Sequence, residues 1–288
     1  MALDNVSINE VGNQNIKTKS ILILGVDSKI GSNLIRYLKK NVSYRVIGTT
    51  RRKQKSKEIH SLYYLDLETL ESNFSKENLD VIVICAGVTN QTICNDQPEL
   101  TWKINVDNTI EAIKLLASPE THIIYLSSVS VFDGTKPFCN QLEIPNPINN
   151  YGKQKVAVEL LLRKKYTNYA ILRLTKVISK ETHFIRDWRD SADKGELIRA
   201  YANRYLSPVE LGEVCKTISL IIDTRSFGLF QLGGDVEQSY FEFAKAYFQG
   251  EPKLSELVVA VDDPDDSRGI FNSLSSNLPV VDFDSPLS

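Results

Sequence analysis

The sequence predicts an α/β fold in which a doubly wound parallel sheet carries a small C-terminal lobe. Short runs of β-branched residues alternate with amphipathic stretches, an order typical of parallel strands joined by crossover helices. The runs are apolar throughout, which indicates strands that are buried on both faces of the sheet. They occupy residues 21–24, 46–47, 81–84, 123–126 and 170–172.

Amphipathic stretches between these runs predict three long helices, at 30–40, 102–116 and 151–165. Beyond Thr175 the pattern becomes less regular. There we expect a helix at 184–193, a strand at 197–201, a helix that starts at Ser207–Pro208 and a strand at 228–232. In the second of these helices Ser207 would be the cap and Pro208 the first helical residue. Residues 262–288 are expected to form a loop.

These elements divide the chain into a nucleotide-binding domain and a smaller lobe. We expect a flexible tail at 1–19 and a Rossmann-type domain at 20–174, to which 208–232 returns. Residues 175–207 and 233–288 would then form the substrate-binding lobe and a C-terminal tail.

Composition excludes several classes of function. The chain has 288 residues, 42% of them apolar, and a formal net charge of −2, so it has no global attraction for nucleic acid or an acidic membrane. No apolar run is long enough to cross a bilayer. The four cysteines form no Cys-x-x-Cys pair, and Cys85 is predicted to be a reduced core thiol. We therefore expect a cytoplasmic protein.

The turn after the first strand resembles a loop that binds a diphosphate. A glycine at the strand end permits a tight turn, and a second glycine lets the helix pack closely on the sheet. The helix N-terminus then offers free N–H groups and a positive dipole to the phosphates. The predicted cofactor contacts here are Gly25, Ser28, Ile30 and Gly31. Ser28 replaces the usual middle glycine, and a tight turn without a ligand is the alternative.

The end of the second strand predicts which dinucleotide binds. An acidic residue at this position would bind the adenosine ribose hydroxyl of NAD, but here the strand runs into Arg51 and Arg52. Arginine suits a 2′-phosphate, so NADP(H) is the expected cofactor. A solvated basic turn is the alternative.

Tyr151 and Lys155 carry the strongest chemical signal. They lie four residues apart at the start of a predicted helix and therefore share a face. A lysine cation and the cofactor's positive field would favour the phenolate of a tyrosine whose pKa is ordinarily near 10. Ser128, at the end of the preceding strand, could hydrogen bond to the reacting oxygen. These three residues are predicted to be catalytic.

With these motifs, the region from Ser20 to about Leu232 resembles the extended short-chain dehydrogenase/reductases of the epimerase/dehydratase type. Trp102–Thr109 is similar to the family's Asn-Val-x-x-Thr helix, which implies that Asn105 is its active-site asparagine; a purely structural bridge is the alternative. Arg173 matches the Leu-Arg pair before the substrate lobe.

The resemblance also implies further cofactor contacts. Asp66 and Leu67 resemble the family's adenine-binding pair of an aspartate and an apolar residue, although Asp66 could equally cap a helix. Ala86 and Gly87 lie where the family's backbone faces the cofactor.

Within this family, Leu126–Gly134 is similar to the Ile-Ser-Thr-Asp-Tyr-Val-Phe-Asp-Gly segment of dTDP-4-dehydrorhamnose reductases. The match places Ser128 at the catalytic threonine. Val129–Ser130 lacks the Asp-Glu pair of the related dehydratases, which argues against a dehydratase. The resemblance extends from Phe184 to Pro208, although Asn203–Arg204 replaces the usual Asp-Gln.

Candidate substrate contacts are Ser128, Arg186, Trp188 and Arg204, because arginine pairs with phosphate and tryptophan stacks on rings. A plain amphipathic helix surface accounts equally well for Arg186 and Trp188. Isolated histidines at 60, 122 and 183 suggest no metal site, although a loosely held Mg²⁺ stays open.

The sequence thus predicts an NADPH-dependent reductase of a 4-keto nucleotide sugar. A nucleotide-sugar 4-epimerase with a tightly held cofactor is one alternative. A non-catalytic NADP-binding regulatory subunit is another, motivated by Ser28 and Val129–Ser130. The sequence does not decide whether the protein is a homodimer.

Overall fold

The computed structural model describes residues 18–58, 61–74, 77–265 and 269–279. Most of the predicted N-terminal tail, His60 and residues 280–288 lie outside the described residues. In the part that is described, no helix combines the length and apolar character that crossing a membrane requires.

A seven-stranded sheet forms the larger domain, and every pairing within it is parallel. The strand order is β11-β6-β5-β4-β1-β2-β3. From β1 the chain adds strands first toward one edge of the sheet and then, starting with β4, toward the other edge. The strands are β1 Lys19–Leu24, β2 Tyr44–Thr50, β3 Leu62–Tyr64, β4 Val81–Ile84, β5 His122–Ser128, β6 Tyr169–Leu174 and β11 Gly228–Leu232. The doubly wound α/β fold is therefore confirmed, and the crevice at the reversal is where such folds bind ligands.

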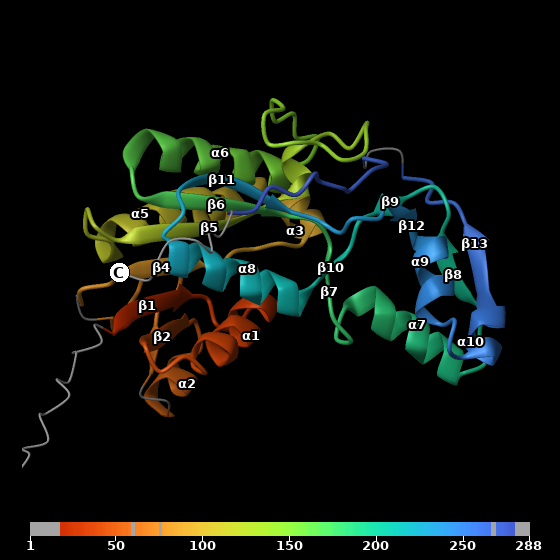
Figure 1. Cartoon of the computed structure of the whole chain (residues 1–288), viewed down its shortest axis with the longest axis horizontal. Coiled ribbons are helices and arrows are strands. Elements are labelled where there is room, and N and C mark those ends of the chain that lie inside the picture. The colour runs from red at the N-terminus through yellow and green to blue at the C-terminus, as the bar shows by residue number, and fades with distance from the viewer. Residues whose placement is uncertain (1–17, 59–60, 75–76, 266–268, 280–288) are drawn as a thin grey trace, which may run out of the picture.

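Helices cover both faces of the sheet (Figure 1). On one face, α1 Lys29–Leu38 and α8 Leu211–Thr224 bury their apolar sides against the sheet. On the other face, α5 Asn108–Leu116 and α6 Asn150–Lys165 do the same. The short helices α2 Lys53–Glu58, α3 Gln91–Asp96 and α4 Pro98–Trp102 complete this domain.

The predicted helix at 102–116 is interrupted. Residues Lys103–Asp107 form a π-helical turn between α4 and α5. π-helical turns occur often at functional sites because they re-aim one side chain within an otherwise regular helix. Here the turn contains Asn105.

The smaller lobe has its own apolar core and lies at one end of the molecule (Figure 1). Its helices are α7 His183–Asp193, α9 Tyr240–Tyr247 and α10 Pro252–Leu257. Its strand pairs are β8 Ile198–Tyr201 with β13 Val258–Val261, and β9 Tyr205–Leu206 with β12 Gln238–Ser239. β7 Val177–Ile178 and β10 Val209–Glu210 pair at the junction with the sheet.

The prediction of a helix that starts at Ser207–Pro208 is wrong. The helix begins at Leu211, and Glu210 occupies the cap position. The Val209 N–H donates a hydrogen bond to the Lys176 carbonyl (3.0 Å), and the segment pairs with β7. The Ser207 Oγ caps nothing and has no hydrogen-bond partner among the described residues. A tertiary strand pairing thus overrides a local helix-start signal.

Candidate active site

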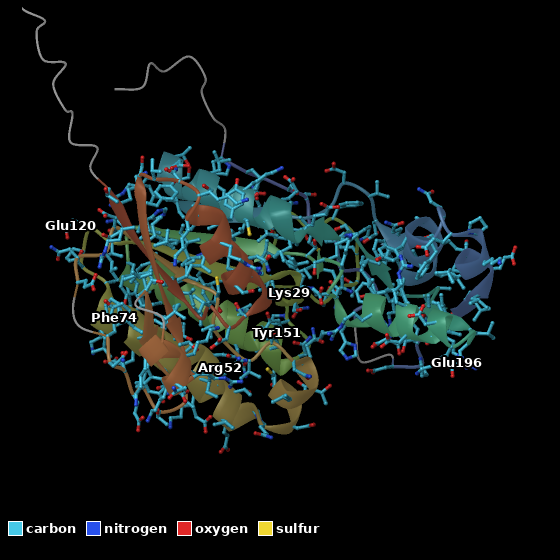
Figure 2. The ribbon with its side chains drawn as sticks, turned by 90° about the horizontal axis from the view of Figure 1, so that it is seen from below. Lys29, Arg52, Phe74, Glu120, Tyr151 and Glu196 are labelled. Atoms are coloured by element: carbon cyan, nitrogen blue, oxygen red, sulfur yellow. The ribbon has the colours of Figure 1, made fainter. Side chains whose placement is uncertain are left out.

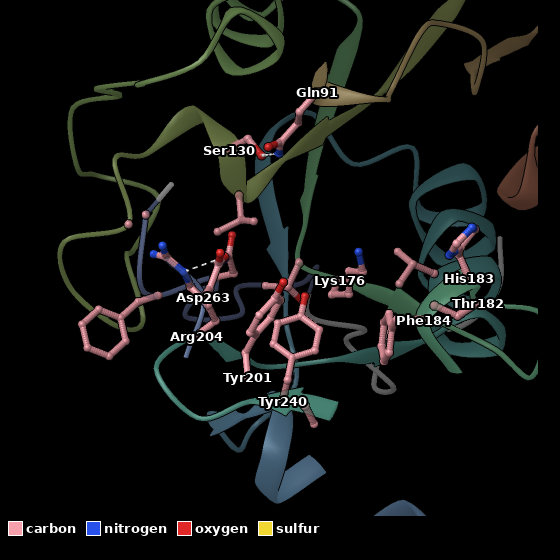
Figure 3. A pocket seen from close by; sticks show the side chains of 18 of the residues that line it. Gln91, Ser130, Lys176, Thr182, His183, Phe184, Tyr201, Arg204, Tyr240 and Asp263 are labelled. Atoms are coloured by element: carbon pink, nitrogen blue, oxygen red, sulfur yellow. Dashed lines mark hydrogen bonds and ion pairs between the residues drawn. The ribbon is translucent and has the colours of Figure 1, made fainter. Parts of the chain in front are cut away.

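A cavity of about 1200 Å³ lies between the sheet domain and the lobe (Figure 3). Its lining includes Ser128 and Tyr151 from the sheet domain and Trp188, Tyr201 and Arg204 from the lobe. The two sides therefore contribute different side chains to one cavity.

The loop after β1 has the close packing that a diphosphate loop needs. Gly25 has φ +93°, and a Cβ there would lie 2.7 Å from Ala86. A Cβ on Gly31 would lie 2.3 Å from the Gly25 carbonyl oxygen. Both positions therefore require glycine. Ile30 follows in the first turn of α1 and packs against the core.

Ser28 has a role in this loop that the sequence did not reveal. It is the N-cap of α1, and its Oγ accepts a hydrogen bond from the Gly31 N–H at 3.0 Å. The same hydroxyl donates to the Gly25 carbonyl at 2.9 Å. Serine thus ties the loop together where the family usually has glycine.

An acidic side chain does reach the end of β2, although the sequence of that strand shows none. Asp27, from the loop after β1, accepts hydrogen bonds from Thr50 Oγ1 at 2.5 Å and Lys55 Nζ at 3.0 Å. Arg52 Nε lies 3.8 Å from its carboxylate, while Arg51 is exposed. Burial alone would raise the pKa of Asp27, but these hydrogen bonds and the nearby cations hold that pKa below its ordinary value.

The remaining predicted cofactor contacts follow β3 and β4. Asp66 accepts a hydrogen bond from the Glu68 N–H at 2.9 Å, the local pattern of a turn, and Leu67 is buried. Ala86 lies against Gly25. Gly87 is exposed and has φ +140°, a conformation that favours glycine.

The structure brings Ser128, Tyr151 and Lys155 together. Ser128 ends β5 and hydrogen bonds to the Tyr151 hydroxyl. Lys155 lies one turn further along α6, with its Nζ 5.5 Å from the centroid of the Tyr151 ring. That ammonium donates a hydrogen bond to the Leu126 carbonyl at 2.8 Å. Tyr151 and Lys155 are each only 9% exposed, so water is largely excluded from the pair.

Burial governs the protonation of this group. It raises the pKa of Tyr151, and the hydrogen bond with Ser128 opposes that rise only in part. It lowers the pKa of Lys155 to about 8, while the charge of Glu159 opposes the shift. The protein by itself therefore favours the neutral phenol of Tyr151, because desolvation disfavours the charged form.

Asn105 connects two parts of the site through the hydrogen bonds of its side-chain amide. Its Oδ1 accepts from the Val88 N–H at 2.7 Å, and its Nδ2 donates to the Val88 carbonyl at 2.8 Å. The Nδ2 also donates to Gln154 Oε1 at 2.7 Å. The loop after β4 is thereby attached to α6, directly beside Lys155.

A buried ion pair beneath α6 was missed by sequence reasoning. Arg173 donates to both Glu159 oxygens, at 2.9 and 2.7 Å, and Ser127 Oγ donates to Oε1 at 2.6 Å. Arg173 also donates to Gln231 Oε1 at 3.3 Å. The available signal was an acidic residue one helical turn beyond Lys155, on the same helix face.

The predicted substrate residues lie in different settings. Trp188 lines the cavity but is mostly buried in the lobe core. Arg204 also lines the cavity, where its Nε donates to Asp263 Oδ2 at 3.1 Å. Arg186 lies on the exposed side of α7 and is not among the lining residues.

The other residues singled out from the sequence lie outside the catalytic group. His122 is buried against Phe227, and exposed His183 pairs with Asp187 at 2.6 Å. Within the described residues, no group of three histidine, cysteine or acidic side chains is arranged to hold a metal ion. Each of the four cysteines is a free thiol, and Cys85 is partly buried against the sheet core.

Known proteins of similar sequence and fold include sugar-nucleotide reductases and a methionine adenosyltransferase subunit. The methionine adenosyltransferase 2 subunit beta of Bos taurus is 24% identical over 242 residues, which cover 81% of this chain and 72% of the relative. A dTDP-4-dehydrorhamnose reductase of Sinorhizobium fredii is 26% identical over 207 residues, covering 68% of this chain and 69% of the relative.

A solved structure with the same fold is the dTDP-4-dehydrorhamnose reductase of Bacillus anthracis in complex with NADP. It superposes with a TM-score of 0.73 at 21% identity and covers 90% of each chain. The family model described as the RmlD substrate binding domain matches residues 19–278. The resemblance to dTDP-4-dehydrorhamnose reductases is thus confirmed, and the chain belongs to the RmlD substrate binding domain family.

Proposed function

We propose that this protein is an NADPH-dependent reductase of a 4-keto nucleotide sugar. The observation that carries the proposal is the buried group of Ser128, Tyr151 and Lys155 on the wall of the cavity. Such a group can orient a carbonyl oxygen and protonate it, as reduction of a ketone requires.

The dinucleotide crevice fits the cofactor. The glycines at 25 and 31 leave no room for a Cβ, and the N-terminus of α1, with its positive dipole end, directly follows the loop. In this proposal Arg51 and Arg52 contact the 2′-phosphate, and Lys155 contacts the ribose next to the nicotinamide. NADPH, when bound, supplies the hydride for the carbonyl carbon.

The residues of the chain handle the oxygen and its proton. Ser128 donates a hydrogen bond to the substrate carbonyl oxygen and fixes its position. Tyr151, kept neutral by burial, donates its phenolic proton to the same oxygen as negative charge develops there. Lys155 stabilises the phenolate that this leaves behind, because its ammonium lies over the same ring.

The test is NADPH oxidation with a panel of 4-keto nucleotide sugars. We expect one member to consume NADPH in equal amount to the alcohol formed, and calorimetric titration to show tighter binding of NADP than of NAD. Conversion of a 4-hydroxy nucleotide sugar into its C4 epimer without net consumption of NADPH would instead indicate the 4-epimerase. Equal or tighter NAD binding would remove the NADP assignment.

A second candidate is a non-catalytic NADP-binding subunit of a larger assembly. It is favoured by the similarity to a protein named as a subunit of methionine adenosyltransferase 2. If the wild type binds NADP but reduces no member of the panel, size-exclusion chromatography with the methionine adenosyltransferase of the same organism tests this role. Co-elution supports it, and separate elution removes it.

A further inference from the structure

Two lysines from opposite sides of the cavity face the same space. Lys29 is the first residue of α1, and Lys176 follows β6 at the junction with the lobe; both line the cavity. Lys29 Nζ donates to Thr182 Oγ1 at 2.6 Å and so crosses from the sheet domain to the lobe. Figure 2 shows Lys29 and Tyr151, which both line the cavity, and Figure 3 shows the Lys176 side chain at the cavity.

The described residues make no ion pair with either lysine, although the acidic residues Asp187 and Glu196 also line the cavity. Burial lowers the pKa of Lys29, and the charges of Lys176 and Arg186 lower it further, opposed only by Glu181. Burial also lowers the pKa of Lys176. Among the described residues the Lys176 ammonium has no hydrogen bond or ion pair, and it lies over the Phe184 ring, whose centroid is 5.5 Å away.

The same cavity presents aromatic side chains beside these cations. Tyr201 and Tyr240 lie edge to face, with centroids 6.5 Å apart, and both line the cavity (Figure 3). Phe184 packs against Tyr240 at 5.3 Å. Aromatic faces suit a nucleobase, and paired cations suit a diphosphate.

We propose that Lys29 and Lys176 bind the diphosphate of a nucleoside diphosphate group in the substrate. This inference rests on the proposed function, because it assigns the diphosphate to a nucleotide sugar. Like charges in a partly desolvated cavity repel each other, and a ligand anion between them removes that cost. The Lys29 side chain is turned toward Thr182 of the lobe, which favours the substrate diphosphate over that of the dinucleotide.

Calorimetric titration with dTDP and UDP tests the site without any need for turnover. We expect the wild type to bind one of these diphosphates at least ten-fold more tightly than its nucleoside, with an affinity that falls as salt is raised. Lys176→Met and Lys29→Met should each weaken that binding roughly ten-fold. Affinity for NADP should change less than two-fold, and Lys176→Arg should keep most of the diphosphate affinity.

Lys216→Met is the matched control. Lys216 is an exposed lysine of α8 that pairs with Glu213 at 2.7 Å, far from the cavity lining. It should leave all affinities unchanged. Thermal unfolding of Lys176→Met should occur near the wild-type temperature, because the Lys176 side chain is exposed.

Two results would overturn the proposal. One is equal binding of the nucleoside and its diphosphate by the wild type. The other is a loss of NADP affinity in the lysine variants as large as their loss of dTDP or UDP affinity, which would assign the lysines to the dinucleotide. If the diphosphate results are as expected but no sugar is reduced, the reductase is rejected and the diphosphate-binding site stands.

Discussion

We call the surroundings of Asp27 and Arg52 the adenosine end and those of Tyr151 and Lys155 the reaction end, after the roles proposed for them. The two ends differ in how their positive charges are compensated. At the adenosine end, Arg52 and Lys55 share the carboxylate of Asp27, whose pKa stays below its ordinary value. At the reaction end, Lys155 is buried against a carbonyl and two aromatic rings, and its pKa is lowered to about 8. The first end is charge-compensated by the protein, whereas the second keeps a cation ready to stabilise a developing anion.

This difference means that the two ends should respond separately to substitution. The reaction end should control turnover and its pH dependence. The adenosine end should control the choice of dinucleotide and leave the chemical step unchanged.

The largest expected effect is that of Tyr151→Phe. The ring and its packing remain, but the proton donor is lost, so turnover should fall by about 10²–10⁴-fold. NADP affinity should stay nearly intact, because Tyr151 lies at the reaction end. Steady-state kinetics together with calorimetry measure both quantities. Full activity in this variant would reject the mechanism even though the fold is right.

Glu159→Gln tests the buried ion pair of Glu159 and Arg173 beneath α6. It leaves the buried guanidinium of Arg173 without its charge partner, so the free energy of unfolding should drop by about 3–5 kcal/mol. Denaturant titration measures this drop. Lys114→Gln, which breaks the exposed pair with Glu111, should change it by less than about 1 kcal/mol. Equal effects of the two substitutions would contradict the role given to burial.

The pH dependence should belong to Lys155. The value of kcat/KM should fall above pH 8, by roughly ten-fold per pH unit, as the Lys155 ammonium loses its proton. Stability should move the other way: the unfolded chain keeps this proton up to about pH 10.5, so the free energy of unfolding rises with pH from about 8 to 10.5. Lys155→Met should lack both trends and also bind NADP less tightly. A wild-type rate that stays level to pH 10 would argue against this assignment.

Asp27→Asn tests the adenosine end. Removing the carboxylate frees Arg52 and Lys55 for a 2′-phosphate and removes a repulsive charge. NADP affinity should rise about five-fold relative to NAD, equivalent to about 1 kcal/mol. Competitive titration with both dinucleotides measures the ratio, while turnover at saturating NADPH should not change. A fall in NADP affinity would show that Asp27 chiefly positions the two cations.

The smallest effect is expected for Ser28→Gly. Glycine is tolerated at an N-cap at a cost of a few tenths of a kcal/mol, and the loop is then closer to the family pattern. NADP affinity should stay within about two-fold or improve. Ser28→Ala should lose more stability, about 1 kcal/mol. A large loss of NADP affinity in the glycine variant would reveal a direct contact from the Ser28 hydroxyl.

The sequence by itself was sufficient to predict the parallel sheet and the proximity of Ser128, Tyr151 and Lys155. Strand ends of a parallel sheet share one edge, and residues four apart share a helix face, so both facts follow from local periodicity. The glycines at 25 and 31 were likewise readable, because close backbone approach admits no other residue.

Tertiary structure alone decided the contacts between segments that are distant in sequence. Asp27 reaches the end of β2, Val209 pairs with β7 instead of opening a helix, and Lys29 reaches Thr182 across the domain boundary. No periodicity encodes such contacts, since each depends on how two separately specified elements pack. The same packing sets the protonation of Tyr151: the sequence placed a lysine beside it, but the depth at which both are buried decides that the phenol stays neutral.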